Sequence, residues 1–387
     1  MMVDFSLTEA DVRLMDMARA ERAAARTVSR EIDRIPESET MANEDHAVVA
    51  GTVSPHAALK AEKEPISGPY ITECLMTMVG HHEFTTRPAP EPFGSWIVNE
   101  FGDPAQVEAY GKYRLVIGIS EPSAGADPSA TTTSARYDAE TDEWILNGEK
   151  IFISNINRSE GAVVLAKGEP DASGKRPFFN FVVLNETRGF KLTPPMRKLG
   201  IHYHDLGGFV MEDVRVPSLA KLERGFVNVQ ARFNHNRPVI AALGVGMVRS
   251  LLDFTHGKLA ESGIKVDYAK GRLARSYAED KLIRMEALWE AAWSVIMRVK
   301  WLEEQLGKGA LELQTESAIA KAMGGKATRQ ISQGCMELLG AEGISEEYLA
   351  EKWFRDARIT DIYEGPGEIH RLTIARKLLG YKKGELD

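Results

Sequence analysis

The 387-residue sequence predicts an α+β fold in three segments, because the periodicity of its apolar residues changes twice along the chain. Residues 1–114 carry apolar residues at helical spacing, residues 115–224 carry short apolar or alternating runs, and helical spacing returns over residues 225–387. These changes predict an N-terminal α-helical domain, a middle antiparallel β-domain and a C-terminal four-helix bundle.

The N-terminal segment predicts several helices. Thr8 is a suitable N-cap for a first helix that extends to about Ile32, since a threonine hydroxyl can accept a hydrogen bond from a free N–H group of the first turn. Residues 33–68 begin as an acidic loop and continue as helix or coil. Further helices are predicted over residues 69–80, 95–101 and 104–113.

The middle segment has the pattern of a small antiparallel barrel or sandwich. Asn147-Gly148 predicts a tight hairpin turn, because both residue types tolerate positive φ angles. A β-domain without any functional site would show the same periodicity. The apolar runs are separated by Gly, Asp, Asn and Pro, and they lie at residues 163–166, 179–184, 209–211 and 214–216.

The C-terminal segment predicts long amphipathic helices. A helix over residues 226–254 should be interrupted at Pro238, which has no N–H group and clashes with the preceding turn. Two more helices are predicted over residues 270–306 and 312–339. The last of them repeats an apolar residue at every fourth position, which indicates a bundle core and no cofactor box: Ile319, Met323, Ala327, Ile331 and Cys335.

Charge and cysteine content argue against several classes of function. A net charge of −8 leaves no basic excess for phosphate contacts, so we expect no nucleic-acid binding. Cys74 and Cys335 give neither a disulfide framework nor a zinc spacing, and no metal site is expected. We find no apolar run near about 18 residues and no signal peptide, so we expect no membrane contact and a cytoplasmic location.

The tail contains a carboxylate at a break between two apolar segments. Residues 365–367 read Gly-Pro-Gly, which cannot lie inside a stable helix, and Glu364 immediately precedes them. A helical pattern resumes at Ile369. A glutamate at such a turn can point into a cavity, where partial desolvation would raise its pKa and suit it as a general base. The alternative is a surface turn glutamate.

Two segments of the β-domain carry residues suited to a flat polar ligand. Residues 117–127 end a strand at Ser120 and continue in a loop of small residues, whose N–H groups can hold anionic or carbonyl oxygens. Phe152 and Ser154 lie two apart, so they share one face of a strand, where a ring and a hydroxyl could contact a heterocycle. In isolation, an ordinary turn, a core phenylalanine and an exposed serine explain the same residues.

Taken together, these segments resemble the acyl-CoA dehydrogenase family. There the tail reads Arg-Asp-Ala, a few residues, Ile-Tyr-Glu-Gly, and a helix that ends in Ala-Arg and a short apolar run. Residues 355–357, 362–365 and 375–380 match this pattern in order and spacing. The resemblance covers nearly everything from about Leu115 to the end of the chain, and is poor over residues 33–100.

The resemblance implies FAD as the cofactor. The family binds flavin with Thr-Glu-Pro followed by Ala-Gly-Ser-Asp, and Ser120 here stands for the threonine and keeps its hydroxyl. Phe152 would lie against the isoalloxazine, with Ser154 near flavin N5, in a segment similar to the family's Asn-Gly-x-Lys strand. The predicted cofactor contacts are Ser120, Gly125, Phe152, Ser154, Gly340 and Glu368.

The resemblance also implies the substrate side of the site. Arg237 resembles an arginine that lies near the acyl-CoA in the family, and a structural arginine is the alternative. Some branches of the family place their catalytic glutamate at the position of Asn236, which has no carboxylate, so Glu364 is the one family base position that is filled. The predicted substrate contacts are Arg237, Asn234 and Gly365.

Several positions depart from the family pattern. Residues 262–267 replace an Arg-x-x-Phe-Gly segment that reaches FAD in a neighbouring subunit. Ala341 stands where the family has a second glycine, and residues 366–367 read Pro-Gly in place of Thr-Ser. Each change alters a contact on the adenosine side, so we expect FAD to be held less tightly or by a different partner subunit.

The implied reaction is α,β-dehydrogenation of an acyl-CoA thioester to a trans-2-enoyl-CoA, with Glu364 as the α-proton base and hydride transfer to flavin N5. Electrons would pass to an electron-transfer flavoprotein. The alternatives are the reverse, reductive reaction, oxygen as acceptor, or a subunit of a heteromeric dehydrogenase that completes its partner's site. A homotetramer is the family's usual assembly, and no motif fixes the acyl chain.

Overall fold

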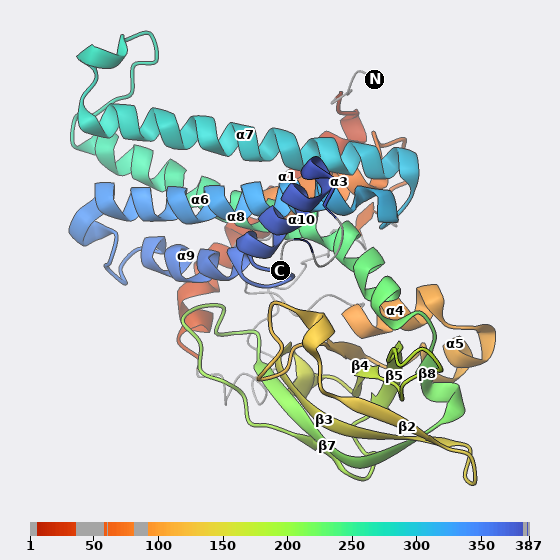
Figure 1. The fold of residues 1–387 in the computed structure, drawn as a ribbon. Helices are drawn as coiled ribbons and strands as arrows, with labels where there is room; N and C mark the ends of the chain where they lie inside the picture. The colour runs from red at the N-terminus through yellow and green to blue at the C-terminus, as the bar shows by residue number, and fades with distance from the viewer. Residues whose placement is uncertain (1–5, 36–57, 60, 81–91, 382–384, 386–387) are drawn as a thin grey trace.

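The computed structural model describes residues 6–35, 58–59, 61–80, 92–381 and 385, and arranges them as a helical layer and a β-domain (Figure 1). The helical layer and the sheet each have their own hydrophobic core. The α+β class is confirmed. The region predicted as an acidic loop followed by helix or coil lies largely outside the described residues.

The N-terminal helices are divided between the two cores. The predicted cap of α1 is present, since Oγ1 of Thr8 accepts a hydrogen bond from the N–H of Asp11 at 3.2 Å. Helices α1 and α3 contribute to the helical core, whereas α4 packs on the sheet. The described helices of this segment are α1 (Glu9–Asp33), α3 (Pro69–Gly80), α4 (Phe93–Phe101) and α5 (Pro104–Tyr110).

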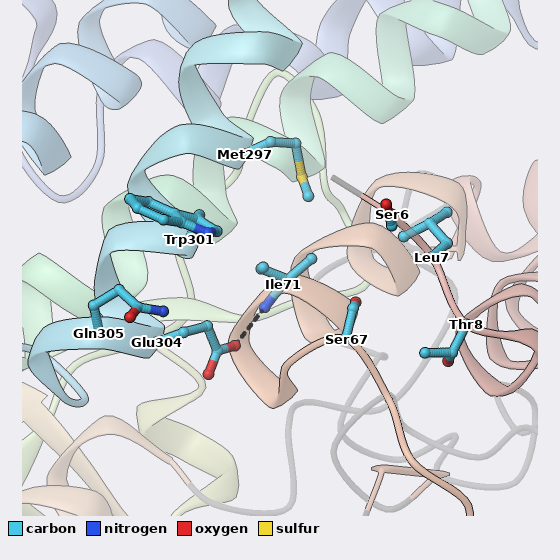
Figure 2. Close-up of a pocket in the computed structure, with 9 residues that line it drawn as sticks. All are labelled: Ser6, Leu7, Thr8, Ser67, Ile71, Met297, Trp301, Glu304 and Gln305. Carbon is cyan, nitrogen blue, oxygen red and sulfur yellow. Dashed lines mark hydrogen bonds between the residues drawn. The ribbon is translucent and has the colours of Figure 1, made fainter. Parts of the chain in front are cut away.

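Helix α7 holds the first turn of α3. Oε1 of Glu304 accepts a hydrogen bond from the backbone N–H of Ile71 at 3.0 Å (Figure 2). It also accepts one from the backbone N–H of Tyr70 at 2.6 Å. These are groups that a helix cannot satisfy internally. A pocket of about 200 Å³ lies beside this contact, between α7 and the start of α1, and contains none of the predicted site residues.

The β-domain is one eight-stranded sheet in the order β6-β7-β3-β2-β4-β5-β8, with β1 paired to β4. Its pairings are antiparallel except for β1 with β4 and a single parallel pair between β2 and β4. The strands are β1 (Leu115–Gly118), β2 (Ser134–Asp138), β3 (Glu143–Ser154), β4 (Gly161–Lys167), β5 (Phe178–Leu184), β6 (Phe190–Leu192), β7 (Leu206–Pro217) and β8 (Lys221–Leu222).

The predicted hairpin turn at Asn147-Gly148 is wrong. Both residues lie inside β3, at a point where the register with β7 shifts. The extra residue on β7 is accommodated at Asp213, which has a φ of 49°. Its backbone N–H donates to Oδ1 of Asn147 at 2.9 Å, and Nδ2 of Asn147 donates to its carboxylate at 3.0 Å. The asparagine therefore bridges a bulge. Bulges and tight turns both contain unusual backbone geometry, so the same residue types are found in both.

The C-terminal segment contains the long helices that Figure 1 shows above the sheet. Helix α6 starts against the sheet, where Nδ2 of Asn180 donates to the backbone oxygen of Gly225 at 3.0 Å, and continues into the bundle. The helices are α6 (Gly225–Glu261), α7 (Tyr277–Leu306), α8 (Gln314–Leu339), α9 (Ala350–Ala357) and α10 (Gly367–Leu379).

Helix α6 continues through Pro238, so the predicted interruption is wrong. Proline removes the hydrogen bond that the carbonyl of Asn234 would accept within the helix. Oγ of Ser317 on α8 donates to that carbonyl instead, at 2.7 Å. Nζ of Lys300 on α7 donates to the next carbonyl, that of His235, at 3.0 Å. Neighbouring helices thus supply the partners that allow α6 to stay continuous.

The predicted apolar stripe of α8 is confirmed in its second half, where Ala327, Ile331 and Cys335 are buried in the helical core. Helices α6 and α8 approach closely, since a Cβ at Gly324 would lie 2.6 Å from that of Ala241. Within the described chain, α6 alone is long and apolar enough to cross a membrane, and 72% of its most apolar window is buried. That burial is typical of a core helix.

Candidate active site

The centre of the site is the turn that carries Glu364, between a 3-10 turn at Arg358–Asp361 and α10. Glu364 has a φ of 57° and Gly365 a φ of 98°, so two consecutive residues adopt the left-handed region. Glycine is needed at the second position for space as well, because a Cβ there would lie 2.9 Å from Nε2 of His370. The buried histidine ring therefore supports the turn from α10.

Helix α6 contacts Glu364 with two consecutive residues. Nδ2 of Asn236 donates to Oε1 of the carboxylate. Nε of Arg237 donates to the backbone oxygen of Glu364 at 3.3 Å. The second oxygen, Oε2, is buried and has no hydrogen-bond partner within the described chain. The predicted base and the predicted substrate arginine thus lie together.

Helix α8 adds a second buried cation to this site. Lys321 is fully buried, and its Nζ donates to the backbone oxygen of Gly365 at 3.4 Å. Burial lowers the pKa of Lys321 to about 8, opposed by the negative charges of Glu364 and Asp361. Burial likewise lowers the pKa of Arg237 to about 10. Both groups remain cationic at neutral pH beside the Glu364 turn.

Burial raises the pKa of Glu364 above its ordinary value, despite the hydrogen bond from Asn236 and the nearby charges of Arg232, Lys321 and Arg237. The shift has the sign that a general base requires, because proton transfer is most effective when the base's pKa approaches the working pH. Burial and the charges of Arg237 and Lys321 lower the pKa of His370 to about 3, so this histidine is neutral.

Asn234 belongs to a different cluster. Its side chain is fully buried, Nδ2 donates to the backbone oxygen of Ala310 at 2.9 Å, and Oδ1 accepts from Nε2 of Gln230 at 2.7 Å. Both ends of its amide are therefore occupied by the protein. The structure gives this residue a structural role in α6, and its substrate contact stays a prediction.

The β-domain presents Phe152 on a bulge of β3. The ring is 60% exposed, the residue has a φ of 57°, and the register with β7 shifts between Lys150 and Ile153. Ser154 is exposed as well. An exposed aromatic ring in strained backbone is unusual, and strain of this kind is commonly found where a ligand binds.

The loop after β1 lies beside this bulge. The backbone N–H of Ile151 donates to the oxygen of Ser120 at 2.9 Å. Gly125 is exposed, and a Cβ at that position would meet no atom within 4 Å. An open small-residue loop joined to an exposed aromatic residue fits a flat heterocycle with a phosphate-bearing tail.

A buried ion pair ties these two segments together. Glu121 follows Ser120, and its Oε1 accepts from Nζ of Lys150 at 2.8 Å, with neither side chain exposed beyond 2%. Residues 131–133, three threonines, add hydrogen bonds from their hydroxyls and from two backbone N–H groups. These donors hold the pKa of Glu121 well below its usual range, although burial opposes them.

The remaining two predicted cofactor residues lie at helix ends. Gly340 ends α8 with a φ of 57°, and nothing lies within 4 Å of the position of a Cβ. Glu368 lies in the first turn of α10, where its exposed carboxylate is 3.1 Å from Arg371. Their contact with the cofactor stays a prediction.

Sequence reasoning missed three buried polar residues of the site. Lys321 stands between Ile319 and Met323, outside the stripe of apolar residues at every fourth position, and it was not singled out. His370 directly follows the first apolar residue of the tail helix. Lys150 is part of a segment that was noticed for its aromatic residue. The match to the Asn-Gly-x-Lys pattern could have singled out Lys150. No signal in the sequence distinguishes Lys321 and His370 from exposed residues, because burial on several sides comes from the tertiary packing.

Family models match two parts of the chain. The model for the C-terminal domain of acyl-CoA dehydrogenases matches residues 223–379, and the model for the middle domain matches residues 116–214. Together they cover more than half of the sequence. These matches and the α+β fold define an FAD-dependent oxidoreductase that acts on CH–CH groups.

The chain belongs to the acyl-CoA dehydrogenase family. It is 33% identical to the human mitochondrial short-chain specific acyl-CoA dehydrogenase over 271 residues, which are 67% of this chain and 62% of that protein. It is 28% identical to acryloyl-CoA reductase (NADH) of Anaerotignum propionicum over 291 residues, 73% of this chain and 72% of that one.

Solved structures share the fold over nearly the whole chain. A glutaryl-coenzyme A dehydrogenase in complex with glutaryl-CoA aligns with a TM-score of 0.79 and 23% identity, covering 98% of both chains. Butyryl-CoA dehydrogenase from Megasphaera elsdenii aligns with a TM-score of 0.76 and 24% identity, covering 97% of this chain and all of that one. The three-segment fold predicted from the sequence is therefore confirmed.

Proposed function

We propose that this protein oxidises an acyl-CoA thioester to a trans-2-enoyl-CoA, with Glu364 as the base that removes the α-proton. The observation that carries the proposal is the environment of this carboxylate. Its Oε2 is buried without a partner in the described chain, burial raises its pKa, and it stands on a strained turn. A desolvated carboxylate of this kind is suited to remove a weakly acidic proton.

The proposed reaction removes one hydrogen from the substrate as a proton and one as a hydride. The α-proton moves to Glu364, the β-hydrogen leaves with two electrons, and a carbon–carbon double bond forms between these carbons. When bound, FAD supplies the acceptor for that hydride. The chain's own residues bind and orient the thioester, and Arg237 and Lys321 place positive charge beside the turn that carries Glu364.

The residues that would hold FAD are Ser120, Gly125, Phe152 and Ser154, with Gly340 and Glu368 as outlying contacts. The exposed ring of Phe152 and the open space at Gly125 support this assignment. Arg237 and Gly365 are the proposed substrate contacts, because both belong to the Glu364 turn or touch it.

An electron-transfer flavoprotein is the proposed electron acceptor, and the cytoplasm the proposed location. A second candidate function is the reduction of an enoyl-CoA. The similarity to acryloyl-CoA reductase (NADH) favours this alternative. Both directions use the same base, since the proton that Glu364 removes in oxidation is the one that it returns in reduction.

We propose a homotetramer, with a heteromer as the alternative. Leu372, Leu378 and Leu379 of α10 are 40%, 76% and 66% exposed, so the last helix presents apolar surface that another subunit would cover. Size-exclusion chromatography with light scattering measures the mass of the assembly directly.

The visible spectrum of the purified protein, recorded anaerobically before and after adding a panel of saturated acyl-CoAs, tests the proposed oxidation. We expect a flavin band that bleaches with at least one thioester. Glu364→Gln should keep the flavin band but lose the bleaching. Bleaching in that variant at the rate of the unmodified protein would contradict the assignment of the base.

A further inference from the structure

We propose that Asn236 is a positioning residue that occupies Oε1 of Glu364 and so assigns Oε2 as the atom that takes the substrate proton. This inference rests on the proposed function of Glu364. It adds to that function the contact of Asn236 with Oε1, the assignment of Oε2 as the reacting oxygen, and helix α6 as the element that orients the carboxylate. The sequence suggested only that Asn236 cannot itself act as a base.

The two oxygens of the carboxylate have different surroundings. Oε1 accepts the hydrogen bond from Nδ2 of Asn236. Oε2 is buried and has no partner in the described chain. A carboxylate that is held by one oxygen cannot rotate freely about its last bond, so the second oxygen keeps its direction and its lone pairs for the substrate. An amide in this position therefore orients the base without neutralising it.

The turn of α6 that carries Asn236 is fixed from both neighbouring helices. The carbonyl of Asn234 accepts from Ser317 of α8, and the carbonyl of His235 accepts from Lys300 of α7. His235 also contacts α7 through its ring, since Nδ1 lies 2.8 Å from Oε1 of Glu303. The consecutive residues Asn234, His235 and Asn236 thus each have a side-chain partner on another element. The partner of Asn236 is Glu364.

The electrostatic surroundings of Glu364 come from helices α6, α8 and α10 and from the turn itself. Helix α6 contributes the cations Arg232 and Arg237, α8 contributes Lys321, and the turn and α10 contribute Tyr363 and the neutral His370. The side chain of Asn236 also contacts the carboxylate but carries no charge. Its hydrogen bond favours the ionised form of Glu364. Its removal should therefore raise the pKa of the base while leaving every nearby charge in place.

The test compares Asn236→Leu, which removes the amide at nearly constant volume, with Asn236→Asp, which keeps the shape and adds a carboxyl group. The acid limb of the pH profile of kcat/KM should move to higher pH by roughly one unit in N236L, the equivalent of one lost hydrogen bond. It should move further in N236D, because two adjacent carboxyls share a proton.

Asn228→Leu is the matched control. Asn228 is a buried asparagine on the same helix, and its Nδ2 donates to the backbone oxygen of Glu223 at 2.8 Å, away from Glu364. N228L should leave the acid limb unchanged even if it lowers the melting temperature. An equal shift of the acid limb of kcat/KM in N228L and N236L would mean that the shift comes from destabilisation of α6 in general, and it would overturn the proposal.

A second measurement separates this inference from the function on which it rests. The infrared carboxyl band that is absent from E364Q reports the titration of Glu364 without turnover. We expect N236L to shift that titration upward. An unshifted titration overturns the role of Asn236 whether or not Glu364 is the base, whereas an active E364Q overturns the base assignment and leaves the shifted titration as evidence for the contact.

Discussion

Nζ of Lys150 lies 2.8 Å from Oε1 of Glu121, and both side chains are buried. The pair joins the loop that follows β1 to the strand that carries Phe152. Burial lowers the pKa of Lys150 to about 8, with Glu121 acting against that change. The contact therefore fixes the relative position of the two segments that we assign to the flavin.

Lys150→Met should destabilise the protein by about 3–5 kcal/mol, because it leaves the carboxylate of Glu121 buried without its cation. Urea denaturation measures the change. Lys191→Met is the control, since Lys191 pairs with Glu212 at 2.6 Å on the surface, where such a pair contributes about 1 kcal/mol or less. Equal losses in the two variants would show that burial of the Lys150 pair has no special effect.

Glu364→Gln should make the protein more stable at pH 8. The folded pKa of Glu364 lies above its unfolded value, so the folded state binds more protons and loses stability as pH rises from the unfolded pKa through the folded one. Glutamine removes this loss. Melting temperatures should converge below about pH 4, where the carboxyl is protonated in both states. A variant less stable than the parent at pH 8 would contradict the raised pKa.

Gly365→Ala should cost more than about 1 kcal/mol, because alanine is strained at a φ of 98° and its Cβ would meet the ring of His370. Gly174→Ala is the matched control, since Gly174 has a φ of 80° and open space around it. The difference between the two variants measures the contact with the ring. His370→Ala in the G365A background should recover part of that difference, and no recovery would mean that the ring gives way without cost.

Ser317→Ala should cost about 1–3 kcal/mol, because it leaves the buried carbonyl of Asn234 without a donor. In a Pro238→Ala background the same substitution should cost less, since alanine restores the helical N–H. Ser332→Ala on the same helix is the control, because the hydroxyl of Ser332 donates within α8, to the oxygen of Arg329 at 3.1 Å. Chemical denaturation of the parent, the two single variants and the double variant completes the cycle, and equal costs in both backgrounds would refute the compensation.

The order of helical, β and helical segments could be predicted from the sequence, because periodicity reports local geometry. Sequence reasoning misread Asn147-Gly148 and Pro238, since each residue type has two structural uses and the choice depends on partners far away in the chain. Through the resemblance it predicted Glu364 and Arg237 as site residues, and the structure brings these two residues into contact. The contact of Asn236 with Glu364 joins residues 128 positions apart, which no local pattern reports.

The proline in α6 makes this helix dependent on its neighbours during assembly. With its own hydrogen-bond ladder interrupted at Pro238, the turn that carries Asn236 acquires its partners only when α7 and α8 have docked. A chain that has formed its helices without docking α7 and α8 on α6 lacks the contacts that hold the turn beside Glu364. On the proposed role of Glu364, activity recovered after refolding should report the completed bundle more strictly than helix content does.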